Sequence, residues 1–167
     1  MFWWLYYANV TTDFSEKPLV IWLQRGPGAS STGYGKRLQR FFIDNPVGSG
    51  FSYVTSSAEF ARTNAQIADD LVECMRAFYK QVPQFKNVPV YITSESYGGK
   101  MAAEFAFNWY KAEKEGSIES NLKGVSLGDA WISPEDSVMT YAPYLLQTVQ
   151  DKQLKSLFTP NIYSGFN

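Results

Sequence analysis

The 167-residue sequence contains no histidine, and this absence restricts its function more than any motif does. Histidine is the usual general base that activates a serine nucleophile. The single cysteine, Cys74, allows no intrachain disulfide and no thiolate metal cluster. Its place on the apolar side of a predicted helix indicates a buried packing residue. We expect neither a metal nor any other cofactor.

Long apolar runs and a strong net charge are also missing. No run approaches the roughly 20 residues of a membrane span, and residues 2–10 are too short and lack the basic flank of a signal peptide. A formal net charge of −1 gives no electrostatic basis for binding nucleic acid or an anionic membrane. We therefore expect no nucleic acid partner and no membrane span.

The composition favours a single domain with a large core. Hydrophobic residues make up 45% of the chain and aromatic residues 17%. The chain is too short for two ordinary domains. Apolar, β-branched and aromatic runs predict strands at residues 2–8, 19–24, 41–46, 88–93 and 122–127. Helical periodicity follows at residues 60–82 and 100–114, and less regularly at 135–158. This alternation predicts an α/β fold with a mostly parallel sheet and flanking helices.

Three acidic residues accompany the first helical pattern. Asp69, Asp70 and Glu73 fall on its polar side, and we interpret them as solvated rather than catalytic. Pro83 is expected to end this helix, because proline lacks the amide hydrogen that a helix interior requires.

Residues 88–105 organise the rest of the chain as a strand, a tight turn and a helix. The turn is Ser94-Glu95-Ser96-Tyr97-Gly98, which approximates the Gly-x-Ser-x-Gly pattern of a nucleophile elbow. Ser96 would lie at a helix N-terminus, where free amides and the helix dipole stabilise negative charge. The alternative is an ordinary Ser/Gly turn between a strand and a helix, and the motif alone does not decide between them.

A glycine-rich loop follows the strand predicted at residues 19–24. Such a loop can direct backbone amides at a developing oxyanion. A phosphate cradle is the competing interpretation, but the loop lacks the Gly-Lys-Ser/Thr ending of a P-loop. The connection from Gly35 to Phe41 is brief for two parallel neighbours, which predicts that a segment is missing here.

Four motifs in order resemble the serine carboxypeptidases, a family of the α/β-hydrolase fold. They are Trp22-Leu-Gln-Arg-Gly-Pro-Gly-Ala-Ser-Ser31, Asp44-Asn-Pro-Val-Gly-Ser-Gly-Phe-Ser-Tyr53, Ser94-Glu-Ser-Tyr-Gly-Gly-Lys100 and Gly128-Asp-Ala-Trp-Ile-Ser-Pro134. The resemblance covers essentially the whole chain but under half of a family member. It implies a partial α/β-hydrolase fold, incomplete at its C-terminal side, in a single truncated domain over residues 1–167.

The resemblance also implies a role for each matching residue. Ser96 corresponds to the nucleophile that forms the acyl-enzyme, and the amides of Gly26 and Tyr97 to the oxyanion hole. Gln24 and Glu95 correspond to residues that bind the terminal carboxylate of a peptide substrate. Two carboxyl groups in contact cannot both ionise, so Glu95 would share a proton with that carboxylate. This arrangement suits the acidic lysosomal or secretory setting of the family.

Departures from the family pattern suggest an inactive chain. Arg25 replaces the first glycine of the oxyanion loop, at a cost of ~1 kcal/mol or more if that position needs positive φ. The resemblance places the catalytic Asp and His in the family's C-terminal part, which has no counterpart here. Loss of a triad partner typically lowers kcat by ~10⁴ to 10⁶. We therefore expect serine carboxypeptidase ancestry with little or no hydrolysis by this chain alone.

Three further interpretations stay open. The chain could be a non-catalytic pseudo-enzyme or a peptide- or protein-binding fragment. It could be an esterase that uses an acidic base such as Asp129, which would need that carboxylate within about 3 Å of the Ser96 hydroxyl or one water away. It could also self-associate, because an incomplete sheet leaves an open edge.

Overall fold

The computed structural model describes residues 1–8, 13–23 and 38–148. By its internal contacts the chain divides into two compact units, Met1–Ile132 and Ser133–Asn167. Each unit is described by itself.

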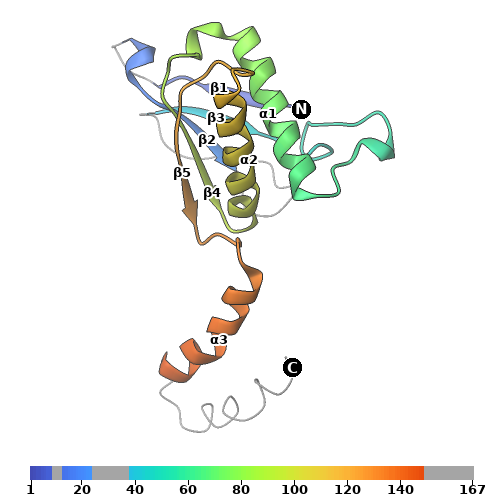
Figure 1. Cartoon of the computed structure of the whole chain (residues 1–167), viewed down its shortest axis with the longest axis vertical. Helices are drawn as coiled ribbons and strands as arrows, with labels where there is room; N and C mark the ends of the chain where they lie inside the picture. The colour runs from blue at the N-terminus through green and yellow to red at the C-terminus, as the bar shows by residue number, and fades with distance from the viewer. Residues whose placement is uncertain (9–12, 24–37, 149–167) are drawn as a thin grey trace. The chain divides into compact units, whose positions relative to one another are not determined.

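The first unit is built on a five-stranded sheet (Figure 1). The strands lie in the order β1-β3-β2-β4-β5, and β1 is antiparallel to β3 while the other neighbours are parallel. The mostly parallel α/β sheet predicted from the sequence is confirmed. The strands are β1 (Trp3–Tyr6), β2 (Leu19–Leu23), β3 (Gln39–Ile43), β4 (Val90–Glu95) and β5 (Leu122–Gly128).

Alternate residues of the central strands form one apolar face. Leu19, Ile21 and Leu23 of β2 are almost completely buried. In the parallel register Leu19 lies beside Val90 and Ile21 beside Ile92, both of which are also buried. Because side chains alternate along a strand, every second residue of these strands contributes to the same core face.

Helices α1 (Asn64–Gln81) and α2 (Tyr97–Lys114) lie side by side on this face (Figure 1). In α1, Phe78 packs its ring 4.6 Å from that of Phe41 and 5.5 Å from that of Trp3. Cys74 is buried within the same core, as predicted. The aromatic residues therefore join α1 to β1 and β3.

Helix α1 begins later than residue 60, where the sequence pattern placed it. Thr63 is the N-cap, and its side chain accepts a hydrogen bond from the Gln66 amide while the Gln66 side chain accepts from the Thr63 amide. This reciprocal capping box fixes the helix start more sharply than apolar spacing can. Ala65, expected on the apolar side, is exposed in the first turn.

The three acidic residues of α1 differ in burial. Asp69 and Glu73 are exposed, as predicted, whereas Asp70 is partly buried. Burial, and then the negative charge of Asp69, raise the pKa of the Asp70 carboxyl above its usual value. Asp70 is therefore less solvated than the sequence pattern indicated.

A partly buried polar network ties the end of α2 to the start of β5. The Trp109 indole donates to the Ser120 hydroxyl at 2.8 Å, and that hydroxyl donates to Glu113 at 2.6 Å. Glu113 also accepts from the amide of Leu122 at 3.0 Å. Between the two elements, Gly116 takes φ of +70°, which explains why the helix breaks where predicted.

The strand connection that seemed too brief has sufficient length. β2 and β3 are parallel neighbours, and residues 24–38 separate them. A parallel crossover needs about a dozen residues or more, so counting from Gly35 rather than from the end of β2 underestimated the connection. The length of the connection between β2 and β3 therefore gives no reason to infer a missing segment.

The remaining elements are short or belong to the second unit. Three 3₁₀ turns occupy Phe14–Glu16, Ser57–Glu59 and Pro83–Phe85, the last starting just after α1 ends, where Pro83 was expected to stop it. The second unit contains α3 (Pro134–Thr148), with Pro143 inside it. The predicted helical pattern beyond residue 148 lies outside the described residues. In the described part of the chain, no helix has both the length and the hydrophobicity of a membrane span.

Candidate active site

Ser96 lies at the junction of β4 and α2 with an unusual backbone conformation. Its φ of 56° and ψ of −125° place a non-glycine residue in the left-handed half of conformational space. Such conformations cost of order 1–3 kcal/mol and persist only where the surroundings enforce them. A sharp, strained turn from strand to helix is the defining feature of a nucleophile elbow.

Both sides of the Ser96 peptide are held by the segment that includes the end of β5. The Ser96 amide donates to the carbonyl of Gly128 at 3.1 Å, and the Ser96 carbonyl accepts from the amide of Trp131 at 2.9 Å. The motif at residues 128–134 therefore supports the turn directly. The hydrogen bonds to Ser96 give a structural reason for the resemblance of this motif to the family pattern.

Small residues around Ser96 allow this close approach. A Cβ added to Gly99 would lie 2.3 Å from the Cβ of Ala130 and 3.0 Å from its Cα. A Cβ on Gly128 would lie 3.2 Å from the Ser94 carbonyl oxygen. Gly99 therefore allows the start of α2 to approach the segment after β5, and Gly128 lies close to the backbone of β4.

The start of α2 provides a positive electrostatic environment for Ser96. Ser96 is the N-cap of the helix, and its side chain makes no capping hydrogen bond. Tyr97 is the first helical residue, and an amide at this position has no partner within the helix. The free amides and the helix dipole can stabilise an anion beside the Ser96 hydroxyl.

The structure brings no general base to Ser96 among the described residues. No hydrogen bond joins the Ser96 hydroxyl to another side chain there, Asp129 included. Asp129 follows β5 with φ of 42° and is exposed. The direct hydrogen bond that the esterase interpretation allows between Asp129 and Ser96 is thus not present in the described part of the chain.

The other predicted site residues are only partly described. Glu95 is the last residue of β4, next to Ser96, and lies beside Gly128 in the sheet. Gln24 and Gly26 lie outside the described residues, as does Arg25. The structure therefore brings Glu95, Ser96 and Tyr97 together.

The loop at residues 46–53 depends on a buried acid whose role the sequence analysis did not identify. The Asp44 carboxylate is buried and accepts from the Phe51 amide at 2.9 Å. Gly50 has φ of +52°, and a Cβ there would lie 2.3 Å from the Asp44 carboxylate. The loop presents Phe51 and Tyr53 to solvent, with 70% and 80% of their surfaces exposed. Gly50, six residues after Asp44, was the feature of the sequence that could have indicated this role.

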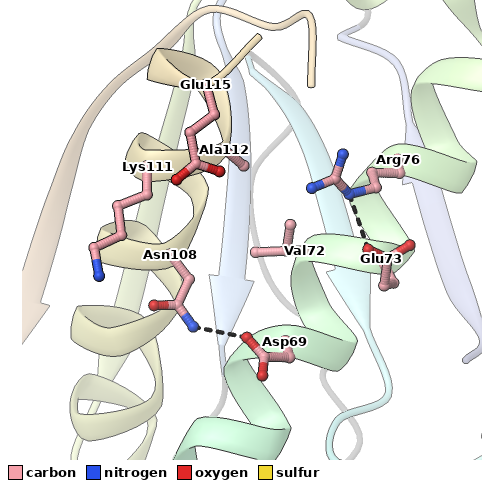
Figure 2. Close-up of a pocket in the computed structure, with 8 residues that line it drawn as sticks. All are labelled: Asp69, Val72, Glu73, Arg76, Asn108, Lys111, Ala112 and Glu115. Atoms are coloured by element: carbon pink, nitrogen blue, oxygen red, sulfur yellow. Dashed lines mark hydrogen bonds and ion pairs between the residues drawn. The ribbon is translucent and has the colours of Figure 1, made fainter. Parts of the chain in front are cut away.

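A separate groove of about 300 Å³ lies between α1 and α2 (Figure 2). Asn108 donates to Asp69 across it at 2.9 Å, and Arg76 pairs with Glu73 at 2.9 Å. Both acidic and basic residues line its walls, and none of the predicted site residues belongs to it. Its lining consists of Asp69, Val72, Glu73, Arg76, Asn108, Lys111, Ala112 and Glu115.

The chain is similar to proteins of one known family. Residues 1–39 and 36–161 match the profile of the serine carboxypeptidase family. The chain belongs to the serine carboxypeptidase family. It is 46% identical to human retinoid-inducible serine carboxypeptidase over 177 aligned residues and 32% identical to serine carboxypeptidase-like 51 of Arabidopsis thaliana over 169. Family membership and the identification made from the four motifs are confirmed.

The fold agrees with a solved structure of a carboxypeptidase. The crystal structure of Kex1(delta)p, a prohormone-processing carboxypeptidase from Saccharomyces cerevisiae, superimposes with a TM-score of 0.76 at 19% identity. The match covers 99% of this chain and 43% of that one. At this identity the likeness supports the fold, which is that of part of a serine carboxypeptidase.

The chain spans about two-fifths of its relatives. The alignment with the human relative covers 92% of this chain and 39% of that protein. The alignment with the Arabidopsis protein covers 87% of this chain and 37% of that protein. The family match has two segments, which overlap at residues 36–39. The alignment with the human relative runs over 177 residues, which is more than 92% of a 167-residue chain. It therefore includes residues of the relative that have no counterpart in this chain.

Proposed function

We propose that this chain carries the nucleophile half of a serine carboxypeptidase site. In the peptide hydrolysis that such a site would perform, the Ser96 oxygen attacks the carbonyl carbon of a C-terminal peptide bond. The C-terminal amino acid leaves with a proton, an ester joins the remaining acyl group to Ser96, and water then hydrolyses that ester. The observation that carries the proposal is the positive φ of Ser96 at the β4 to α2 turn, in a chain of this family.

Oxyanion stabilisation and substrate orientation are assigned to neighbouring groups. The amides of Tyr97 and Gly26 would donate to the carbonyl oxygen as it becomes negative. Gln24 and Glu95 would bind the free carboxylate of the peptide, and Arg25 would narrow the loop beside them. A lysosomal or secretory compartment, the setting of the family, is the proposed location.

Hydrolysis by the isolated chain is expected to be very slow. The sequence contains no histidine, and no described side chain is hydrogen-bonded to the Ser96 hydroxyl. A serine hydroxyl without a base is a poor nucleophile at physiological pH. What remains is the oxyanion hole and the binding of substrate.

Labelling with a fluorophosphonate probe at pH 5 and pH 7 tests this proposal. We expect slow phosphonylation, confined to Ser96 when the modified peptide is identified by mass spectrometry. The Ser96→Ala variant should lose the adduct, whereas Ser57→Ala, which alters an exposed serine distant in sequence, should keep it. Rapid labelling abolished by Ser96→Ala would show a base that the proposal lacks, and labelling elsewhere would refute the role of Ser96.

Peptide binding without turnover is a second candidate function. It is favoured because no described side chain is hydrogen-bonded to the Ser96 hydroxyl at the elbow. We expect a peptide with a free C-terminal carboxylate to bind more tightly at pH 5 than at pH 7, and its C-terminal amide to bind weakly at both. Glu95→Gln should remove the pH dependence. Equal binding of acid and amide would refute a carboxylate site.

A further inference from the structure

The peptide unit that joins Ser96 to Tyr97 is held on its carbonyl side only. The Ser96 carbonyl accepts two hydrogen bonds, from the Gly99 amide at 3.0 Å and from the Trp131 amide at 2.9 Å. The Tyr97 amide, on the other side of the same unit, has no hydrogen-bond partner in the described part of the chain. This free amide is the group that the proposed function assigns to the oxyanion hole.

The orientation of this carbonyl determines the orientation of the amide. A peptide bond is planar and trans, so its C=O and N–H groups point in opposite directions. The bond from Gly99 belongs to the first turn of α2, and hydrogen bonds at helix ends are prone to fraying. The bond from Trp131 comes from outside the helix and so fixes the unit independently of that turn. Donation to the carbonyl also polarises the unit and strengthens its amide as a donor.

A left-handed turn at Asp129 brings the Trp131 amide to this carbonyl. Among the described residues, Ser96 and Asp129 are the non-glycine residues with positive φ, at 56° and 42°. Glu95 lies beside Gly128 in the parallel register, so the two turns begin at the same level of neighbouring strands. The second turn therefore supplies a donor to the first.

Position 129 contributes its backbone conformation rather than its charge. The Asp129 side chain is exposed, and no described residue forms a hydrogen bond or an ion pair with its carboxylate. Aspartate and asparagine are among the few side chains that tolerate the left-handed region. The turn then continues with the Ile132 amide, which donates to the Ala130 carbonyl at 2.9 Å. The residue at position 129 therefore matters for the path of the chain toward Trp131.

We propose that Asp129 and Trp131 are positioning residues for the oxyanion hole. The turn at Asp129 places the Trp131 amide on the Ser96 carbonyl, and that hydrogen bond aims and polarises the Tyr97 amide. The inference rests on the proposed function, which assigns the Tyr97 amide to the oxyanion. Neither positioning residue touches the substrate in this role. A donor that is aimed before the reaction needs no reorganisation when negative charge develops.

An amide-to-ester exchange at position 131 tests the hydrogen bond directly. Incorporating the α-hydroxy analogue of tryptophan replaces the Trp131 N–H by oxygen and keeps the indole. The same exchange at Ile132, whose amide donates to Ala130 instead of Ser96, is the matched control. Loss of an oxyanion donor slows acyl transfer by about 10²–10³. Misaiming one should slow phosphonylation of Ser96 by a fluorophosphonate at least about tenfold, against less than about twofold for the control ester.

Nuclear magnetic resonance of the Tyr97 amide shows whether the bond acts on the oxyanion hole or only on stability. Phosphonylation of Ser96 should move the Tyr97 proton resonance downfield, because the phosphonyl oxygen then accepts from this amide. This change should be smaller in the 131 ester chain, whereas a bond that only stabilises the fold would leave it the same. In chains without an adduct, loss of the bond should move the Ser96 carbonyl carbon and Tyr97 nitrogen resonances upfield.

Substitutions at Asp129 test the turn. Asp129→Val should slow phosphonylation about tenfold, since a β-branched residue disfavours positive φ and the Tyr97 amide would lose its aim. Asp129→Asn and Asp129→Gly should restore the native rate, because both residues tolerate this conformation. Circular dichroism shows whether each variant is folded, and if Asp129→Val is not, the 131 ester gives the result.

Three results would overturn the inference. They are an unchanged rate with the 131 ester, an equal change of the Tyr97 resonance in native and ester chains, or slow phosphonylation of both Asp129→Asn and Asp129→Gly. Absence of a Ser96 adduct in the native chain would instead refute the proposed function. In that case the carbon and nitrogen resonances of the chains without an adduct decide, since upfield shifts in the 131 ester support the positioning bond and unchanged resonances overturn it.

Discussion

The strained conformation of Ser96 depends on the fit between the first turn of α2 and the loop after β5. Positive φ at a serine is enforced by hydrogen bonds from both of its sides, and these bonds require Gly99 to lie against Ala130. A side chain at position 99 would push the two segments apart. The elbow is therefore maintained by residues outside the predicted site.

A pair of glycine substitutions tests this dependence. Gly99→Ala should lower the free energy of unfolding by ~1–3 kcal/mol, since its Cβ would overlap Ala130. Gly124→Ala is the matched control, because its Cβ would meet the Tyr91 ring at an ordinary 3.7 Å. Urea denaturation of both variants measures the difference. Equal losses of stability would contradict the close approach.

Cys74 should behave as a structural thiol. Burial raises its pKa to about 11, so at pH 8 only about one thiol in a thousand would be the reactive thiolate. We expect iodoacetamide to modify the native chain very slowly at pH 8 and faster as the pH rises toward 11. Denaturant should give rapid modification at pH 8. Fast reaction of the folded chain at pH 8 would place Cys74 outside the core.

Sequence patterns placed Ser96 at a turn between a strand and a helix but did not reveal the residues that support this turn. Small residues around a serine between a strand and a helix are a local signal, and they identified residues 94–98. The buried role of Asp44 depends on Gly50 and on the Phe51 amide, which meet it only in the folded loop. Roles that arise from contacts between distant segments leave no local pattern.

At the scale of elements, strand and helix types were predicted well and their boundaries less well. The apolar run of β2 and the period of α1 and α2 gave the correct types because burial repeats with each element's geometry. The start of α1 was placed at residue 60, yet the capping box sets it at Thr63. End points depend on hydrogen bonds of individual residues rather than on periodicity.

Removing the cap should therefore destabilise α1 measurably. Thr63→Ala deletes the hydroxyl that accepts from the Gln66 amide and should cost ~1 kcal/mol of unfolding free energy. Gln81→Ala, at the exposed last residue of the same helix, should change stability by less than about 0.5 kcal/mol. Thermal or urea unfolding compares them. If Thr63→Ala is neutral, the capping box does not hold the helix start.

At the scale of the whole molecule, the sheet order places the support of the elbow on a neighbouring strand. β4 ends at the elbow, and its neighbour β5 supplies Gly128, whose carbonyl accepts a hydrogen bond from the Ser96 amide.

We propose that Ser96 lies in a nucleophile elbow and has no base to activate it among the described residues. Release of the C-terminal amino acid from an N-blocked dipeptide at pH 5 tests this proposal most directly, with Ser96→Ala as the background. We expect the native chain to release no more product than Ser96→Ala does. Sustained turnover by the native chain that disappears in Ser96→Ala would contradict the proposal.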